Sequence, residues 1–174
     1  MFYLNDSDNR SALEQAAFHR SETSEELKQF AKAVLRAAGK ERMDLKRAKA
    51  LISAGEQKAA EIGVPMVLAV VDEGGNLTAL HRMDGSLLAS LSIAQAKAFT
   101  ALALRAPTKE AAASILPGQS LYGLQHTHPG QFCLFGGGVP VFSGKDCIGA
   151  VGVSGGSAEQ DVSVAEAMVQ ETHC

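Results

Sequence analysis

Two histidines of this 174-residue chain have a spacing that could bind a metal ion. His126 and His128 are separated by one residue, so in an extended loop their imidazole rings lie on the same side. Metal sites of this kind commonly need three or four protein ligands, and no third ligand follows at a typical spacing. The alternative is a polar loop whose histidines face water or a neighbouring subunit. We therefore predict no metal site, and we keep the two histidines as candidates for binding a small molecule.

His81 and Arg82 are neighbours whose side chains should meet different environments. They lie in the run 77–83, whose β-propensity and turn-flanked position predict a strand. Period two places His81 on one face with Leu77 and Met83, whereas Arg82 lies on the opposite face.

Arg82 has the chemistry to hold a carboxylate through two parallel hydrogen bonds. The carboxylate could be that of Asp84, that of Asp161 or that of a small acid from solvent. The structural alternative is an ion pair that joins strand to helix or subunit to subunit, and we favour this interpretation.

Several enzyme and nucleotide-binding motifs do not occur in the sequence. There is no GxSxG segment, and the three cysteines have no nearby cue for a Cys-His catalytic pair, so nothing supports a hydrolase. No P-loop or GxGxxG run follows a strand. Gly155 and Gly156 precede a helix, whose free N–H groups could bind an anion. Asp161 in the first helical turn would repel an anion, so a tight strand-to-helix turn is the favoured interpretation.

The strand 77–83 should be half of a hairpin, because turn-forming residues 72–76 separate it from the run 66–71. The run 66–71 is apolar at every position, which is typical of a central strand covered on both faces. Asp72 is expected to form the turn between them.

A second hairpin is predicted for 139–142 and 147–153, with turn chemistry between them. Gly149 and Gly152 interrupt the second strand, which indicates a close backbone neighbour. Ser157 stands three residues before Gln160, a spacing that predicts a capping box at the start of a helix.

Periodicity and capping residues predict helices at about 23–38, 44–63, 86–104, 108–115 and 158–171. The helix 86–104 has large apolar residues on one face and a stripe of mainly small residues nearly opposite, namely Ser90, Ala94, Lys97 and Ala101. Such a stripe could meet another subunit or lie in solvent. The segment 117–131 is predicted to be a long loop, and long loops in compact domains are often functional.

Composition restricts the compartment and the partners. A formal charge of −3 without clustered basic residues argues against a nucleic-acid surface. Three cysteines without CxxC spacing argue against a disulfide framework and suggest the reducing cytoplasm. The N-terminal residues do not have the pattern of a signal peptide, and no apolar run approaches the ~20 residues of a membrane span. We therefore expect a cytoplasmic protein that binds small molecules or protein partners.

Five segments together resemble the GlcG/HbpS-like family, which includes the C-terminal domain of PduO-type proteins. They are VVDEGGNLTALHRMDG at 70–85, SIAQAKAFTAL at 92–102, APT at 106–108, GGGVPV at 136–141 and IGAVGVSGGSAEQD at 148–161. The resemblance covers about residues 44–172. It divides the chain into an N-terminal extension with one helix, residues 1–43, and a GlcG/HbpS-like domain, residues 44–174.

The resemblance implies a profilin-like three-layer α/β/α fold with a five-stranded antiparallel sheet, whose fifth strand would be 132–135. It also implies a homo-oligomer, from a dimer up to an octamer. Some members of the family bind haem, and their genes often lie beside operons for glycolate, glycerol or propanediol use.

The resemblance also implies which residues form a site. Arg82 and Asp84 match the RMDG motif, and Lys97 matches the KA motif, so these three are expected to form a fixed polar cluster. No haem ligand of the family maps securely onto a histidine of this chain. Haem chemistry alone makes the histidines candidates for an axial ligand, namely His81, His126, His128 and, more weakly, His19. A histidine bonded to a backbone carbonyl is the alternative for His81.

Three functional hypotheses follow. The first is an accessory small-molecule-binding protein, with haem or a related tetrapyrrole as ligand. The second is an enzyme for a small hydroxy acid, diol or aldehyde, in which Arg82 holds the substrate and Lys97 or a histidine transfers a proton. The third is a structural partner in a metabolic complex.

Overall fold

The computed structural model describes residues 26–30, 39 and 41–170, and the chain divides into two units, Met1–Lys40 and Glu41–Cys174. In the first unit, residues 26–30 are helical and their side chains are exposed. This confirms part of the helix predicted at 23–38, and the rest of that prediction lies outside the described residues.

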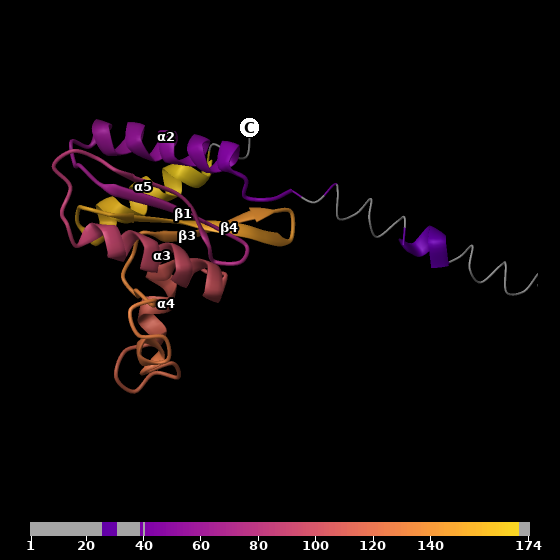
Figure 1. Ribbon diagram of the computed structural model, residues 1–174. Coiled ribbons are helices and arrows are strands. Elements are labelled where there is room, and N and C mark those ends of the chain that lie inside the picture. Colours follow the sequence, from indigo (N-terminus) through magenta and orange to yellow (C-terminus); the bar gives the residue numbers. More distant parts are fainter. Residues whose placement is uncertain (1–25, 31–38, 40, 171–174) are drawn as a thin grey trace, which may run out of the picture. The chain divides into compact units, whose positions relative to one another are not determined.

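The second unit contains a four-stranded antiparallel sheet in the order β2-β1-β4-β3 (Figure 1). The strands are β1 (Val67–Asp72), β2 (Leu77–Arg82), β3 (Gly138–Ser143) and β4 (Asp146–Ser154). Both predicted hairpins are confirmed. β1 is central and is buried along five of its six residues, as its continuous apolar sequence predicts.

The predicted fifth strand at 132–135 is not formed in the structure. The backbone of this segment bonds to side chains on neighbouring helices instead of to a strand. Thr100 Oγ1 accepts a hydrogen bond from Cys133 N at 2.9 Å, and Thr108 Oγ1 donates to the carbonyl oxygen of Phe135 at 2.9 Å. The segment therefore runs beside the sheet as an extended connection.

Helices cover both faces of the sheet (Figure 1). On one face lie α2 (Leu45–Glu61) and α5 (Ala158–Gln170), which also contact each other. On the other face lies α3 (Ser90–Leu104), followed by the short helix α4 (Thr108–Ser114) and a 3₁₀ turn at Leu124–His126. None of the helices in the described residues is both long enough and apolar enough to span a membrane.

Local sequence chemistry explains where these helices begin. Asp44 accepts a hydrogen bond from Arg47 N and caps α2. Before α5, Ser157 N donates to Gln160 Oε1 at 2.9 Å, and Gln160 N donates to Ser157 Oγ at 3.3 Å. This reciprocal pair is the predicted capping box.

The turn between β1 and β2 is built by Asp72. Its Oδ1 atom accepts hydrogen bonds from the backbone N–H groups of Gly74 and Asn76, both at 2.9 Å. Partial burial alone would raise the pKa of Asp72, but the hydrogen bonds from Asn76 and Gly74 outweigh it and lower the pKa. Asp72 is therefore a turn-former, as predicted.

The small-residue stripe of α3 faces its own sheet, so both predicted locations, another subunit and solvent, are wrong. Its members are buried, together with Ala98 and Thr100 on adjacent positions. The reason lies in β4, where a Cβ atom on Gly152 would overlap the carbonyl oxygen of Ala94. Glycine opposite alanine lets the helix approach the sheet closely, as the glycines of this strand predict.

Candidate functional site

Lys97 lies within the buried small-residue stripe of α3 and forms an ion pair with Asp161. Its Nζ atom is 2.6 Å from Asp161 Oδ2 and donates to the carbonyl oxygen of Val153 at 2.9 Å. The side chains of Lys97 and Asp161 are only 1% and 5% exposed. Buried charges are stable when they are paired and hydrogen-bonded in this way.

The glycines before β3 make room for this ion pair. A Cβ atom on Gly137 would lie 2.8 Å from Asp161 Cβ and 3.0 Å from Lys97 Nζ. At the other carboxylate oxygen, Asp161 Oδ1 accepts from Gly156 N at 3.0 Å. Asp161 thus accepts the hydrogen bond of a backbone N–H group that precedes α5 and that could otherwise have bound an anion. This agrees with the favoured interpretation of Gly155 and Gly156 as a tight turn.

The structure does not bring Arg82, Asp84 and Lys97 together as a polar cluster. Arg82 and Asp84 are exposed at the end of β2, whereas Lys97 is buried between α3 and the sheet. The guanidinium of Arg82 donates to the carbonyl oxygen of Ser86 at 3.3 Å, and Asp161 pairs with Lys97. Of the three carboxylates considered for Arg82, Asp161 is therefore ruled out, because it pairs with Lys97.

His81 lies on the opposite face of β2 from Arg82, as the strand alternation predicts. Its register partner is Leu68, which belongs to the core beneath α2 and α5. The imidazole is exposed, and its Nδ1 atom is 2.8 Å from Glu56 Oε1 on α2. His81 thus has a side-chain partner at the surface and borders neither of the two pockets described next.

An apolar pocket of about 470 Å³ lies between the outer face of α3 and the segment that follows the long loop. A volume of this size is within the range of small-molecule sites. The apolar lining comes from Ile93, Ala96, Ile115, Phe132, Leu134 and Phe135, and the remaining lining residues are Ser92, Gln125, Gly130 and Cys133. The loop 117–131 therefore borders a cavity.

Phe135 and Cys133 connect this pocket to the buried ion pair. The Phe135 ring lies with its centroid 5.5 Å from Lys97 Nζ, within the range of a cation–π contact. Burial raises the pKa of the Cys133 thiol, so this side chain is a neutral thiol at neutral pH. The pocket wall thus has an apolar surface, with the charged pair enclosed behind it.

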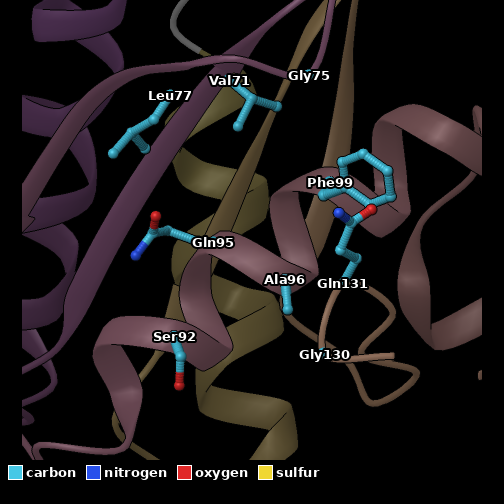
Figure 2. Close-up of a pocket in the computed structure, with 9 residues that line it drawn as sticks. All are labelled: Val71, Gly75, Leu77, Ser92, Gln95, Ala96, Phe99, Gly130 and Gln131. Carbon is cyan, nitrogen blue, oxygen red and sulfur yellow. The ribbon is translucent and has the colours of Figure 1, made fainter. Parts of the chain in front are cut away.

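A second pocket of about 380 Å³ lies beside the first and is shown in Figure 2. It is lined by Val71, Gly75, Leu77, Ser92, Gln95, Ala96, Phe99, Gly130 and Gln131. Figure 2 shows that the carboxamide of Gln95 comes from α3, while that of Gln131 comes from the end of the long loop. This pocket is more polar than the first pocket, because two carboxamide side chains line it and the first pocket has one.

His126 and His128 lie on the loop beside the first pocket. The His128 ring packs against the Phe132 ring, with centroids 5.3 Å apart, and Phe132 lines the pocket. His126 follows Gln125, another lining residue, and its Nε2 atom is 3.4 Å from Gln125 Nε2. Both histidines are exposed. Among the described residues, no three His, Cys, Asp or Glu side chains are grouped to hold a metal ion.

The three glutamines of the pockets, Gln95, Gln125 and Gln131, were not predicted from the sequence. Gln95 lies within the segment 92–102 that carries the family resemblance, but no role was given to it, and no motif contains Gln125 or Gln131. The one usable signal was the length of the loop 117–131, which contains two of them.

Comparison with known proteins identifies relatives of this chain. The family described as haem degrading protein HbpS-like matches residues 43–170. An uncharacterized 15.0 kDa protein of Citrobacter freundii, from the dhaT-dhaS intergenic region, is 49% identical over 70% of this chain and 86% of its own length. The corrinoid adenosyltransferase PduO of the same organism is 39% identical over 68% of this chain, which spans only 36% of PduO.

Two solved structures have the same fold. The PduOC:heme complex is 35% identical, with a TM-score of 0.73, over 75% of this chain and 94% of the other. Klebsiella pneumoniae protein ORFY is 41% identical, with a TM-score of 0.71, over 76% of this chain and 93% of the other.

Proposed function

Because this chain belongs to the GlcG/HbpS-like family, we propose that it is an accessory protein that binds haem or a related tetrapyrrole. The observation in the chain that supports this proposal best is the apolar pocket beside the two loop histidines. The PduOC:heme complex, whose protein is 35% identical to this chain, also supports it.

The residues around this pocket suit a haem group. A porphyrin needs an apolar cleft, and Phe132, Leu134 and Phe135 supply aromatic and aliphatic surface. His126 and His128 carry the imidazole nitrogens proposed to ligate the iron. Bound haem would supply redox or ligand-binding chemistry at its iron. Neither Arg82 nor Lys97 is among the described residues that line the two pockets, so we propose no catalytic role for them.

We propose that the protein forms a homo-oligomer and works in the cytoplasm. The adjacent residues Leu87 and Leu88 are 63% and 76% exposed, and neighbouring exposed leucines are candidates for a subunit contact. The described cysteines, Cys133 and Cys147, are unpaired thiols, which supports a reducing compartment.

Titration with hemin tests the ligand. The wild-type protein is expected to give a saturable Soret shift, and the double variant His126→Ala/His128→Ala should bind at least about tenfold more weakly, since one lost ligand bond of about 1.4 kcal/mol has this effect. His81→Ala is the matched control, because His81 is an exposed histidine that lines neither pocket.

Two outcomes would contradict the proposal. A wild-type spectrum identical to that of hemin in buffer would rule out haem binding. A loss of binding in His81→Ala, with full binding in the loop variant, would place the ligand at α2 and β2 and not at the pocket. Circular dichroism should show that all variants are folded.

A further inference from the structure

Residues 132–137 form one wall of the first pocket and lead into β3, and we call them the wall segment. The segment is not part of a helix, and β3 begins only at Gly138. It supplies four consecutive lining residues, namely Phe132, Cys133, Leu134 and Phe135. The contacts that hold the wall segment against α3 and α4 therefore help to decide the shape of the pocket.

Two buried threonine hydroxyls hold the backbone of this wall. Thr100 Oγ1, on α3, accepts a hydrogen bond from Cys133 N at 2.9 Å. Thr108 Oγ1, on α4, donates to the carbonyl oxygen of Phe135 at 2.9 Å and accepts from Gly138 N at 3.0 Å. Both threonines are 0% exposed, so water cannot easily replace these hydrogen bonds.

Thr108 is the first residue of α4 but does not cap this helix. A threonine near the start of a helix commonly accepts a hydrogen bond from a backbone N–H group of the same helix. The start of α4 has no side-chain cap of this kind, and the Thr108 hydroxyl bonds with the wall segment and β3 instead. A residue that departs from its usual local role often serves a functional site.

The same hydroxyl joins two segments of the family resemblance that have no part in the proposed haem binding. Thr108 ends the segment APT, and Gly138 belongs to the segment GGGVPV. A Cβ atom on Gly138 would lie 2.6 Å from Thr108 Cγ2 and 2.4 Å from the carbonyl oxygen of Lys97. The chain after the wall segment is thus packed directly on α3 and α4, and the neighbouring Phe135 ring lies 5.5 Å from Lys97 Nζ.

We propose that Thr108 is a positioning residue of the ligand site, with Thr100 as the second anchor of the wall segment. Thr108 is not among the described residues that line the two pockets, so it acts through Phe135 and not by contact with a ligand. Loss of its hydroxyl leaves two buried backbone groups without a partner, which favours states in which the wall segment leaves α4. This inference rests on the proposed function, because it concerns the wall of the same site.

Two substitutions at Thr108 and two measurements on the full chain test the inference. Thr108→Val removes the hydroxyl and keeps the shape, whereas Thr108→Ser keeps the hydroxyl. The first measurement is the dissociation constant for hemin from absorbance titration. The second is the rate at which iodoacetamide alkylates Cys133, followed by mass spectrometry of the peptide that contains it. Cys133 is 8% exposed and lies in the wall segment, so its alkylation reports opening of the wall without any ligand.

Thr108→Val should weaken hemin binding by about tenfold and speed the alkylation of Cys133 by about tenfold, because an unpaired buried backbone group has an effect of this size. Thr108→Ser should restore both values to near those of the wild type. Thr100→Val should change both values in the same direction as Thr108→Val, and it serves as the second variant if Thr108→Val does not fold.

Two controls separate positioning from a loss of overall stability. Ile52→Val removes one methyl group from the core beneath α2, on the other face of the sheet, and lowers stability there. Thr78→Val removes a hydroxyl from β2, which lies at the opposite edge of the sheet from β3. Neither control should change the affinity for hemin or the alkylation rate of Cys133.

The outcomes separate this inference from the proposed function. Wild-type values for Thr108→Val, or a Thr108→Ser variant that behaves like Thr108→Val, would overturn the positioning role. Equal changes in Ile52→Val would also overturn it, because the changes would then follow overall stability. A wild-type protein that does not bind hemin would overturn the proposed function, and the alkylation rates would still decide whether Thr108 holds the wall.

Discussion

At the scale of single residues, the hydrogen bonds around Lys97 explain how a lysine can be buried in this fold. One carboxylate oxygen of Asp161 and the carbonyl oxygen of Val153 accept from its ammonium group. Gly156 N donates to the other carboxylate oxygen, so both charges have several partners. A buried ion pair requires this degree of compensation, because each ion has left water.

Removal of one partner should destabilise the fold strongly. Lys97→Met leaves Asp161 buried and unpaired, and we expect the free energy of unfolding to fall by about 3–5 kcal/mol. Urea denaturation followed by circular dichroism measures this loss.

Two further variants give the experiment its controls. Lys97→Met/Asp161→Leu should recover much of the stability, because no isolated charge remains. Lys109→Met breaks the exposed pair with Glu166 and should change stability little. Equal stabilities of Lys97→Met and Lys109→Met would show that the buried pair has no special role.

The sequence indicated that some of these residues have a structural role, but it did not indicate which residues they pair with. Lys97 was predicted as a fixed polar residue, and Asp161 was one of three possible carboxylate partners considered for Arg82, but Lys97 was not considered as the partner of Asp161. Sixty-four positions separate Lys97 from Asp161, so local spacing cannot reveal the pair. The three pocket glutamines were missed for a related reason, since their grouping depends on how the loop folds against α3.

At the scale of secondary-structure elements, the contact between α3 and β4 decides how the layers pack. Small residues on α3 face Gly152 and Ala150, while the larger residues Leu91 and Leu102 are only half-buried beside them. The fully buried face of α3 is therefore made of small residues and Lys97, and Leu91 and Leu102 pack only at its margins as half-buried side chains. Helical periodicity predicted correctly which residues share a face, but it could not indicate which face the sheet would cover.

Gly152→Ala should disturb this contact. The added methyl group would overlap backbone atoms of Ala94 and Ala98, which cannot move aside as a side chain can. We expect a loss of at least about 1–3 kcal/mol in the free energy of unfolding, measured by urea denaturation. Gly144→Asn is the control, because Gly144 has no neighbour within 4 Å and asparagine tolerates its positive φ. A wild-type midpoint for Gly152→Ala would contradict the close packing.

The strands show the same division between local and distant information. Both hairpins could be predicted, because their turn residues and alternation are local signals. The fifth strand implied by the family resemblance is replaced by an extended segment, since Thr100 and Thr108 satisfy its backbone groups. Those contacts come from residues about 30 positions away, which no local pattern reveals.

At the scale of the whole molecule, the proposed assembly must use a surface other than the small-residue stripe, which is already buried against the sheet. Two adjacent leucines before α3, Leu87 and Leu88, are 63% and 76% exposed and are our candidates for that surface.

Charge introduced at these leucines should prevent association. Leu87→Glu/Leu88→Glu is expected to reduce the molar mass measured by light scattering after size-exclusion chromatography, because an interface core disfavours unpaired charge. Leu116→Glu is the control, since Leu116 is also exposed but lies beyond α4. An unchanged mass for the double variant would contradict an interface at these leucines, and a monomeric wild-type protein would contradict the homo-oligomer itself.

The Lys97–Asp161 pair also restricts how this protein can evolve. A random change at either position alone leaves an uncompensated charge in the interior. Replacement of the ion pair by two apolar residues therefore requires two substitutions in distant codons. The variant with only one of these substitutions would fold poorly. Sequence drift should leave this pair in place long after the exposed surface around it has diverged.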